Sequence, residues 1–217
     1  MYGLEHIKMY GEDLSYVLGV CDGDGCVYKE KIKHNMPFPS MRKDYADTYC
    51  IELKAKDKEF VGEFMQKLVR VTKRPDNRKP RSIFKSGNFW RVVVRSKQFG
   101  KFYFNSNWTG LLKQYPRGYL RGFYDSEGNL SYIKGRECIR LFNTEPKKIQ
   151  LINQLLSLLN IKGHTRIYRK RGIPTNYSTN TIDLYVIQIN GKSAKEFLEK
   201  IGSNIPRKQG GDENRRM

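Results

Sequence analysis

The chain has 217 residues, of which 38% are hydrophobic and 12% aromatic, and its 41 Lys and Arg residues against 22 Asp and Glu residues give a net charge of +19. This apolar content excludes an intrinsically disordered chain, and no apolar run comes near the ~18 residues of a membrane-spanning helix. So large a positive charge indicates a polyanionic partner. The length fits one compact body or two small halves.

The N-terminus and the distribution of Cys and His residues argue against a targeting peptide and against a zinc site. Residues 1–14 include Glu5, Glu12 and Asp13 and lack a continuous apolar stretch, which argues against a signal peptide and a transit peptide. We therefore expect the protein to stay where it is made, in a prokaryotic cytoplasm or in an organelle that encodes it. The four cysteines form no C-x-x-C pair and the three histidines are scattered, which argues against a tetrahedral zinc site.

The first half of the chain alternates between helical and strand patterns. Residues 14–21 are apolar enough for a buried helix. Residues 49–56 alternate apolar and polar side chains, which is typical of a strand with one solvent-exposed face. Apolar residues recur at helical spacing over 58–71. Two further strands are predicted near 80–86 and 89–96, and a helix from about residue 97.

The second half repeats this order of elements. Its clearest element is a helix over Pro146–Asn160, where Ile149, Ile152 and Leu156 fall on one face. The other predicted elements are strands near 130–135, 137–143, 163–170 and 182–190, and a helix from Ser193.

Three segments recur in the same order in the two halves. The sequences at 19–27, 50–60 and 92–102 are echoed at 122–130, 138–149 and 186–197, respectively. Such repetition indicates two copies of one unit. We therefore predict an α+β protein made of two pseudo-symmetric αββαββα halves, the first of them with an additional loop at 34–47. The predicted boundaries are 1–112 for the first half, 113–117 for a linker, 118–206 for the second half and 207–217 for a disordered tail.

The most informative repeat is acidic. Residues 17–25 read VLGVCDGDG and residues 120–128 read LRGFYDSEG. The last glycine of each segment is expected to adopt the left-handed conformation that ends a helix, which would place Asp24 and Glu127 at the negative ends of two helix dipoles. A single acidic turn of this kind is usually a solvated loop. The same unfavourable placement in both copies suggests that a cation binds there.

A second feature of the repeat concerns helix packing. Gly19 and Gly122 remove side chains from the two predicted helices, so that the helices can approach closely and bring the two acids together. Paired carboxylates that hold Mg²⁺ are the arrangement that in-line cleavage of a phosphodiester requires.

These two segments resemble the paired motifs of single-chain LAGLIDADG homing endonucleases. The consensus L-A-G-L-I-D-A-D-G aligns with 17–25 and 120–128, although Val17, Cys21, Arg121 and Tyr124 depart from it at helix-packing positions. The resemblance implies that Asp24 and Glu127 are the catalytic metal ligands. It also implies metal contacts from the carbonyls of Gly23 and Ser126, and basic or polar neighbours of the metal, for which the candidates are Lys54, Lys56 and Asn143.

The resemblance further implies a fold and an activity. The fold is a saddle of two antiparallel four-stranded sheets over duplex DNA, with the motif helices packed at the interface. The activity is hydrolysis of both DNA strands with Mg²⁺ or Mn²⁺, leaving short 3′ overhangs, while Ca²⁺ supports binding without cleavage. Because the halves differ in sequence, we expect a monomer with a long asymmetric target. A chain this compact favours an intron-encoded protein.

Basic residues on the predicted strands are the candidate DNA contacts. Twelve Lys and Arg residues lie between Gln66 and Lys101 against one acid, Asp76. Arg91 and Arg95 alternate with apolar residues, so one face of their strand can carry cations into a major groove. About half of these side chains are expected to contact phosphates. The predicted contacts are Lys29, Lys31, Lys33, Lys54, Arg81, Lys85, Arg91, Arg95, Lys134, Arg136, Arg140, Arg166, Tyr168 and Lys170.

Three other functions are compatible with the sequence. Proteins with this motif pair can act as intron maturases that bind RNA, and a DNA-binding regulator could use the acids only to end helices. A basic structural protein of the ribosomal type is the third alternative. Retention of both acids favours the endonuclease.

Overall fold

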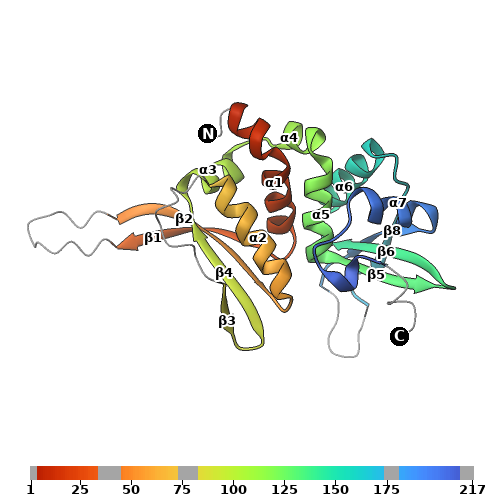
Figure 1. The fold of residues 1–217 in the computed structure, drawn as a ribbon. Helices are drawn as coiled ribbons and strands as arrows, with labels where there is room; N and C mark the ends of the chain where they lie inside the picture. Colours follow the sequence, from red (N-terminus) through yellow and green to blue (C-terminus); the bar gives the residue numbers. More distant parts are fainter. Residues whose placement is uncertain (1–3, 34–44, 73–82, 174–180, 211–217) are drawn as a thin grey trace, which may run out of the picture.

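The computed structural model describes residues 4–33, 45–72, 83–173 and 181–210 (Figure 1). The first half runs in the order α1 (Leu4–Asp22), β1 (Cys26–Lys33), β2 (Tyr45–Ala55), α2 (Lys58–Val71), β3 (Phe84–Ser86), β4 (Phe89–Arg95) and α3 (Lys97–Asn105). After α4 (Thr109–Gln114), the second half follows as α5 (Pro116–Glu127), β5 (Gly128–Ile133), β6 (Arg136–Asn143), α6 (Pro146–Leu158), β7 (His164–Arg169), β8 (Leu184–Asn190), α7 (Lys192–Lys200) and the short 3-10 helix η1 (Pro206–Lys208). The predicted α+β order of the two halves is confirmed.

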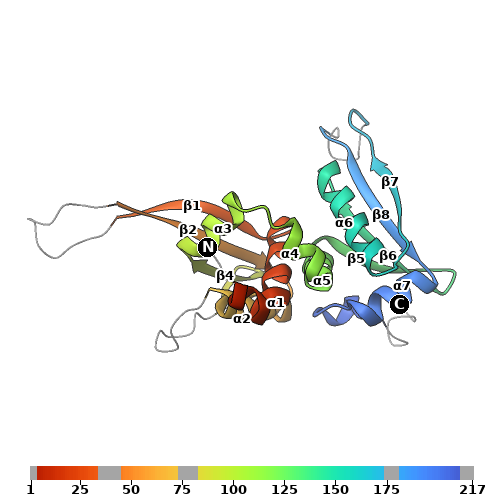
Figure 2. The ribbon, with the colours of Figure 1, turned by 90° about the horizontal axis from the view of Figure 1, so that it is seen from above.

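Each half contains one antiparallel sheet of four strands. The strand orders are β1-β2-β4-β3 in the first sheet and β5-β6-β8-β7 in the second. Figures 1 and 2 show the helices gathered on one side of both sheets, with α1 and α5 at the junction of the halves. Alternate residues of the central strands explain this layering, because Ile51, Leu53 and Val92 are buried against the helices. We call the opposite side of each sheet its open face.

The two halves are joined mainly through α1 and α5. The backbones of the two helices approach so closely that a Cβ at Gly19 would overlap the carbonyl oxygen of Tyr119, and one at Gly122 would overlap that of Tyr16. No larger residue fits at either position without moving a helix. The structure therefore places both glycines where the predicted close approach occurs.

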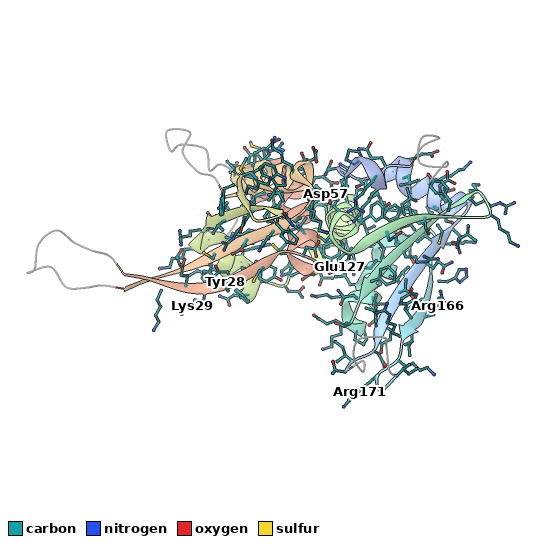
Figure 3. The ribbon with its side chains drawn as sticks, turned by 90° about the horizontal axis from the view of Figure 1, so that it is seen from below. Tyr28, Lys29, Asp57, Glu127, Arg166 and Arg171 are labelled. Atoms are coloured by element: carbon teal, nitrogen blue, oxygen red, sulfur yellow. The ribbon has the colours of Figure 1, made fainter. Side chains whose placement is uncertain are left out.

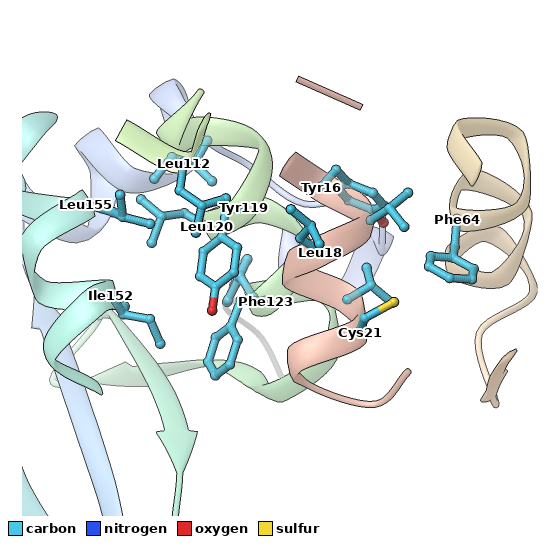
Figure 4. Close-up of a cluster of buried hydrophobic side chains, with 14 of the residues drawn as sticks. Tyr16, Leu18, Cys21, Phe64, Leu112, Tyr119, Leu120, Phe123, Ile152 and Leu155 are labelled. Carbon is cyan, nitrogen blue, oxygen red and sulfur yellow. The ribbon is translucent and has the colours of Figure 1, made fainter. Parts of the chain in front are cut away.

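Aromatic and aliphatic side chains fill the space around this helix pair (Figure 4). Leu18 of α1 and Phe123 of α5 are fully buried, as are Phe64 of α2 and Ile152 of α6. Because α1 packs against α2 and α5 packs against α6, one continuous core runs from the first half into the second. Within the described part of the chain, none of the helices combines the length and apolar character that a membrane span requires.

The glycines that end the motifs are present for a reason other than the predicted one. Neither Gly25 nor Gly128 has a positive φ, and Gly128 is extended, with φ −85° and ψ 152°. Instead, a Cβ at Gly25 would lie 2.9 Å from the Cα of Cys21, and one at Gly128 would overlap the ring of Tyr124. Both glycines allow the chain to turn directly from a helix into a strand.

The predicted linker and tail also differ from the structure. Lys113 and Gln114 belong to α4, and α5 begins at Pro116, so the linker 113–117 is almost entirely helical. Residues 206–208 form η1, and Lys208 is 3% exposed, which contradicts a disordered tail at its start. Residues 211–217 and most of the predicted loop at 34–47 lie outside the described residues.

Candidate active site and nucleic-acid interface

The ends of α1 and α5 bring two acidic residues together. Helix α1 ends at Asp22, and the turn through Gly23 leads to Asp24, while Glu127 is the last residue of α5. A Cβ at Gly23 would lie 3.1 Å from the Cγ of Glu127, so the backbone of the first motif touches the side chain of the second. Asp24 is exposed and Glu127 is half-buried. Seen from the open faces, Glu127 lies between the two sheets (Figure 3).

The charge of Asp24 acts on the carboxyl group of Glu127. Although the Asp24 side chain is accessible, the surrounding protein displaces part of the water around both carboxyl groups, which is the main cause that raises the pKa of each. The charge of Asp24 raises the pKa of Glu127 further. The charge of Lys208 opposes both shifts, and that of Lys148 opposes the shift at Glu127. Two carboxylates that repel each other in a partly buried site are an arrangement that a divalent cation relieves.

Lys208 is a site residue that the sequence did not predict. Its Nζ donates to the main-chain carbonyls of Tyr124 at 3.0 Å, Asp125 at 2.8 Å and Ser126 at 3.4 Å, which are the last carbonyls of α5. Burial lowers the pKa of Lys208 to about 8. An ammonium group at this position neutralises the negative end of the helix dipole.

Lys148 performs the same task at the end of α1. Its Nζ lies 3.3 Å from the main-chain carbonyl oxygen of Asp22 and 3.5 Å from the carboxylate of that residue. Lys148 comes from α6 and Lys208 from η1. The two lysines therefore reach equivalent positions from different elements, and the sequence repeat carries no trace of their equivalence.

A reciprocal pair of hydrogen bonds links the motif helices across their interface. Tyr119 of α5 donates to the carboxylate of Asp22 at 2.8 Å, and Tyr16 of α1 donates to that of Asp125 at 3.0 Å. Both aspartates are buried, and Asp125 also accepts hydrogen bonds from residues 203 and 204. Sequence reasoning missed these groups, although a tyrosine precedes the first acid of both motifs by six residues.

We expect Tyr119→Phe to lower the free energy of unfolding by about 1–3 kcal/mol, because the buried Asp22 carboxylate loses a donor. The hydrogen bond from Tyr119 favours the ionised form of Asp22, whose pKa burial raises. The loss should therefore shrink as acidification protonates Asp22. Urea unfolding at pH 7 and in mild acid measures this difference. Tyr103→Phe, whose hydroxyl lies 3.4 Å from Asp22, is the control and should cost less. A loss that is independent of pH would contradict this assignment.

The residues predicted to surround the metals make contacts of their own within the chain. Lys54 is exposed on β2 with its Nζ 5.0 Å from the centre of the Phe89 ring, and Lys56 is exposed in the turn that follows β2. The Oδ1 of Asn143 accepts a hydrogen bond from the backbone N–H of Glu145 at 2.8 Å, just before α6. Asn143 therefore shapes the start of the helix that carries Lys148. The charges that act on Asp24 and Glu127 are those of Lys208 and Lys148.

The donor atoms at the acid pair suit a hard divalent cation. They are carboxylate and main-chain carbonyl oxygens, which Mg²⁺, Mn²⁺ and Ca²⁺ accept. Among the described residues, no group of three or more His, Cys, Asp and Glu side chains could hold a metal. The carbonyl of Ser126 accepts from Lys208 at 3.4 Å and keeps a second lone pair, so Asp24, Glu127 and the carbonyls of Gly23 and Ser126 are the candidate donors. Such a site would need further oxygens from water or phosphate.

In the first sheet the predicted DNA contacts are divided between the two faces. Lys54, Arg91 and Arg95 alternate with buried residues and lie on the open face. Three others lie, by strand register, on the face that the helices cover: Lys29, Lys31 and Lys85. The side chain of Lys33 is outside the part of the chain that the structure describes. The sequence could not reveal this division, because β1 has no regular alternation of apolar residues that would show which of its faces points to the core. Arg81 lies outside the described residues.

The second sheet gathers its arginines on one face. Strand register places Arg136, Arg140 and Arg166 together on the open face, where Arg166 donates to the side chain of Gln188 at 3.3 Å. Along β7 the alternation of side chains between the two faces is interrupted, because the register shifts between Ile167 and Arg169. The ring of Tyr168 packs 5.2 Å from that of Phe142. The remaining predicted contacts lie outside the strands, namely Lys134 in the β5–β6 turn and Lys170 after β7.

Comparisons with known proteins agree with this architecture. A family model described as a LAGLIDADG-like domain matches residues 114–202. An uncharacterized protein of Methanocaldococcus jannaschii is 29% identical over 209 residues, which cover 91% of this chain and 69% of that protein. A second uncharacterized protein of the same organism is 33% identical over 161 residues, which cover 70% of this chain and 56% of that protein. The chain thus spans about half to two thirds of the length of these relatives.

A solved structure matches the chain over both halves. The homing endonuclease I-DmoI in complex with DNA and Ca superposes with a TM-score of 0.61 at 17% identity, over 91% of this chain and 94% of that one. This likeness covers both sheets and the helix pair between them, and it confirms the predicted fold. Residues 114–202 therefore form a LAGLIDADG-like domain, and the chain as a whole has the fold of the single-chain LAGLIDADG homing endonucleases.

Proposed function

We propose that the protein is a site-specific endonuclease that cleaves both strands of duplex DNA with a divalent metal. The observation that carries this proposal is the convergence of Asp24 and Glu127 at the ends of two packed helices, between two sheets with arginines on their open faces. Variants of I-DmoI, which shares the fold, have been crystallised with the target DNA in the presence of Mn and of Mg. We expect Mg²⁺ or Mn²⁺ to support cleavage and Ca²⁺ to support binding alone.

The residues at the helix ends have distinct tasks in this proposal. Asp24 and Glu127 hold the cation against the phosphates, each acid serving one DNA strand. When bound, the metal lowers the pKa of a water molecule and polarises the phosphoryl oxygens. Lys148 and Lys208 hold the ends of the motif helices in place, and their positive charge offsets the negative charge that builds up on the phosphate.

The two open faces differ, which supports an asymmetric target read by a monomer. The aligned segments CIEL at 50–53 and CIRL at 138–141 place Glu52 in the first sheet where the second sheet has Arg140. A homodimer would present two identical faces to a palindrome, whereas this chain presents two different ones. We further propose cleavage across the minor groove with short 3′ overhangs, and an origin within an intron.

The decisive test is cleavage of the uninterrupted host locus. A supercoiled plasmid would carry the sequences that flank the reading frame, joined without it, and would be incubated with the protein and Mg²⁺. Linear product with both cut ends mapped to one site is the expected result. A control plasmid that keeps the insertion should stay supercoiled. Binding of the plasmid without cleavage in Mg²⁺ and Mn²⁺ would point to a DNA-binding regulator. Binding of the intron transcript, but not of the plasmid, would point to a maturase.

Salt should weaken DNA binding steeply. Each phosphate that a Lys or Arg neutralises releases a counterion, so log K should fall linearly with log[salt] with a slope of about −0.9 per phosphate contact. Arg166→Ala should reduce the magnitude of that slope by about 1 if Arg166 contacts a phosphate. Fluorescence anisotropy in Ca²⁺ between 50 and about 300 mM salt measures it. An affinity that does not change with salt would exclude the open faces as the docking surface.

A further inference from the structure

Two arginines on the open face of the first sheet are held by glutamates in the same manner. The Nε of Arg91 lies 2.6 Å from Oε1 of Glu52, and its Nη2 lies 2.8 Å from Oε2. The Nε of Arg95 lies 2.6 Å from Oε2 of Glu30, and its Nη2 lies 3.1 Å from Oε1. In both pairs the carboxylate binds the side of the guanidinium and not its end.

The pair between Arg91 and Glu52 is the more enclosed of the two. The Arg91 side chain is 35% exposed and the Glu52 side chain 18%. Glu52 lies on the neighbouring strand β2, two residues from Lys54, which is directly opposite Arg91. The Cζ of Arg91 also lies 5.8 Å from the centre of the Phe84 ring on β3. Contacts from two strands therefore fix the direction of this guanidinium before any partner arrives.

The geometry of the hydrogen bonds decides what the arginine can contact next. A guanidinium has five N–H groups, and Glu52 accepts from one at Nε and one at Nη2. Three N–H groups remain at the end formed by Nη1 and Nη2, and these two nitrogens are spaced to donate to the O6 and N7 of a guanine. An arginine whose side is already bound loses little further conformational entropy when it makes this contact.

The same geometry disfavours a phosphate contact. A carboxylate beside the guanidinium cancels most of its charge and would repel a phosphate placed against it. On the open face of the second sheet, Arg140 forms no such pair with a carboxylate among the described residues, and its Nε is buried there without a hydrogen-bond partner. Among the residues of these two open faces, Arg91 is therefore positioned for a base edge rather than for the DNA backbone.

We propose that Arg91 reads a guanine in the major groove and that Glu52 is the positioning residue that aims it. This inference rests on the proposed function, because it requires duplex DNA on the open face of the first sheet. It assigns sequence discrimination to a particular pair of side chains, and it makes the glutamate a determinant of specificity although it need not touch DNA itself.

The test is selection of bound duplexes from a library with a randomised central segment, in Ca²⁺, by the full chain and its variants. The wild-type chain should enrich a guanine at one position. Arg91→Ala and Arg91→Lys should each lose that preference by about 5- to 150-fold, because neither retains the two-nitrogen fork. Glu52→Gln should weaken the preference and leave the other positions unchanged. Lys192→Ala, which removes an exposed lysine of α7 on the helix side of the second half, is the control and should keep the guanine.

Salt dependence on the enriched duplex separates base contact from phosphate contact. Arg91→Lys should keep the wild-type salt slope, and Glu52→Gln should steepen it because the released guanidinium gains a net charge. Unchanged base preferences in Arg91→Ala, together with a shallower slope, would overturn the inference and assign Arg91 to a phosphate. If Glu52→Gln lowers the melting temperature but alters no base preference, the pair is only structural. A wild-type chain that enriches no duplex would overturn the proposed function itself.

Discussion

Asp24→Asn and Glu127→Gln should each lower the rate of DNA cleavage by about 10³-fold or more, which corresponds to about 4 kcal/mol in the activation free energy. Each substitution removes one of the two carboxylates at the adjacent helix ends, and the remaining donors would be too few to hold a metal. In the proposed mechanism each acid serves one DNA strand, so each single variant should be more impaired in cutting its own strand and a nicked intermediate should accumulate. Single-turnover assays on strand-labelled DNA measure both rates.

The controls for this prediction separate chemistry from folding and binding. Both variants should bind the same DNA in Ca²⁺ with an affinity within about threefold of wild type, since the basic faces are unchanged. Glu196→Gln in α7, which ion-pairs on its own helix, should cleave normally. If either site variant cuts both strands at the wild-type rate, the assignment of the acids is wrong.

Gly19→Ala and Gly122→Ala should each lower the free energy of unfolding by about 2–3 kcal/mol, and together they should prevent the halves from docking. The added methyl group meets a backbone carbonyl of the facing helix, and a backbone can yield only if the whole helix shifts. The shift would also move Asp24 away from Glu127, so cleavage should fall along with stability. Guanidinium denaturation and the cleavage assay measure the two effects.

Gly62→Ala in α2 is the matched control for the helix-packing prediction. Its new Cβ would meet only the end of the Ile83 side chain, at 3.5 Å. Removing a helix-interior glycine there should stabilise the protein by about 0.5–1 kcal/mol. Should Gly19→Ala prove as stable as Gly62→Ala, the close approach of α1 and α5 would not be what holds the halves together.

The sequence predicted the elements whose signals are local. Helix α2 begins and ends where the apolar spacing over 58–71 placed it, and the repeats located the sheets and the motif helices. The carboxylates of Asp24 and Glu127 could be chosen because both copies carry an acid at the same place. Periodicity and repetition sufficed in these cases, since neither depends on which distant residues come into contact.

The groups that the sequence missed reach the site through tertiary contacts. Lys208 follows 81 residues after Glu127 and lies in a segment whose composition resembles a tail, so nothing local connects it to α5. Lys148 lies on α6 and Lys208 lies on η1, so the repeat between the two halves does not relate these two lysines to each other. The faces of β1 could not be assigned either, because its lysines alternate with Tyr28, Glu30 and Ile32, which form no consistently apolar face. Only the pairing with β2 fixes which side each set occupies.

The reciprocal bonds from Tyr16 to Asp125 and from Tyr119 to Asp22 limit how these halves can be recombined. Splicing either half onto a foreign partner that lacks the matching phenol would bury an aspartate with no donor from across the junction, at a cost comparable to that of a core mutation. Chimeric nucleases built on this scaffold should therefore be screened first for a tyrosine six residues ahead of each motif's first acid.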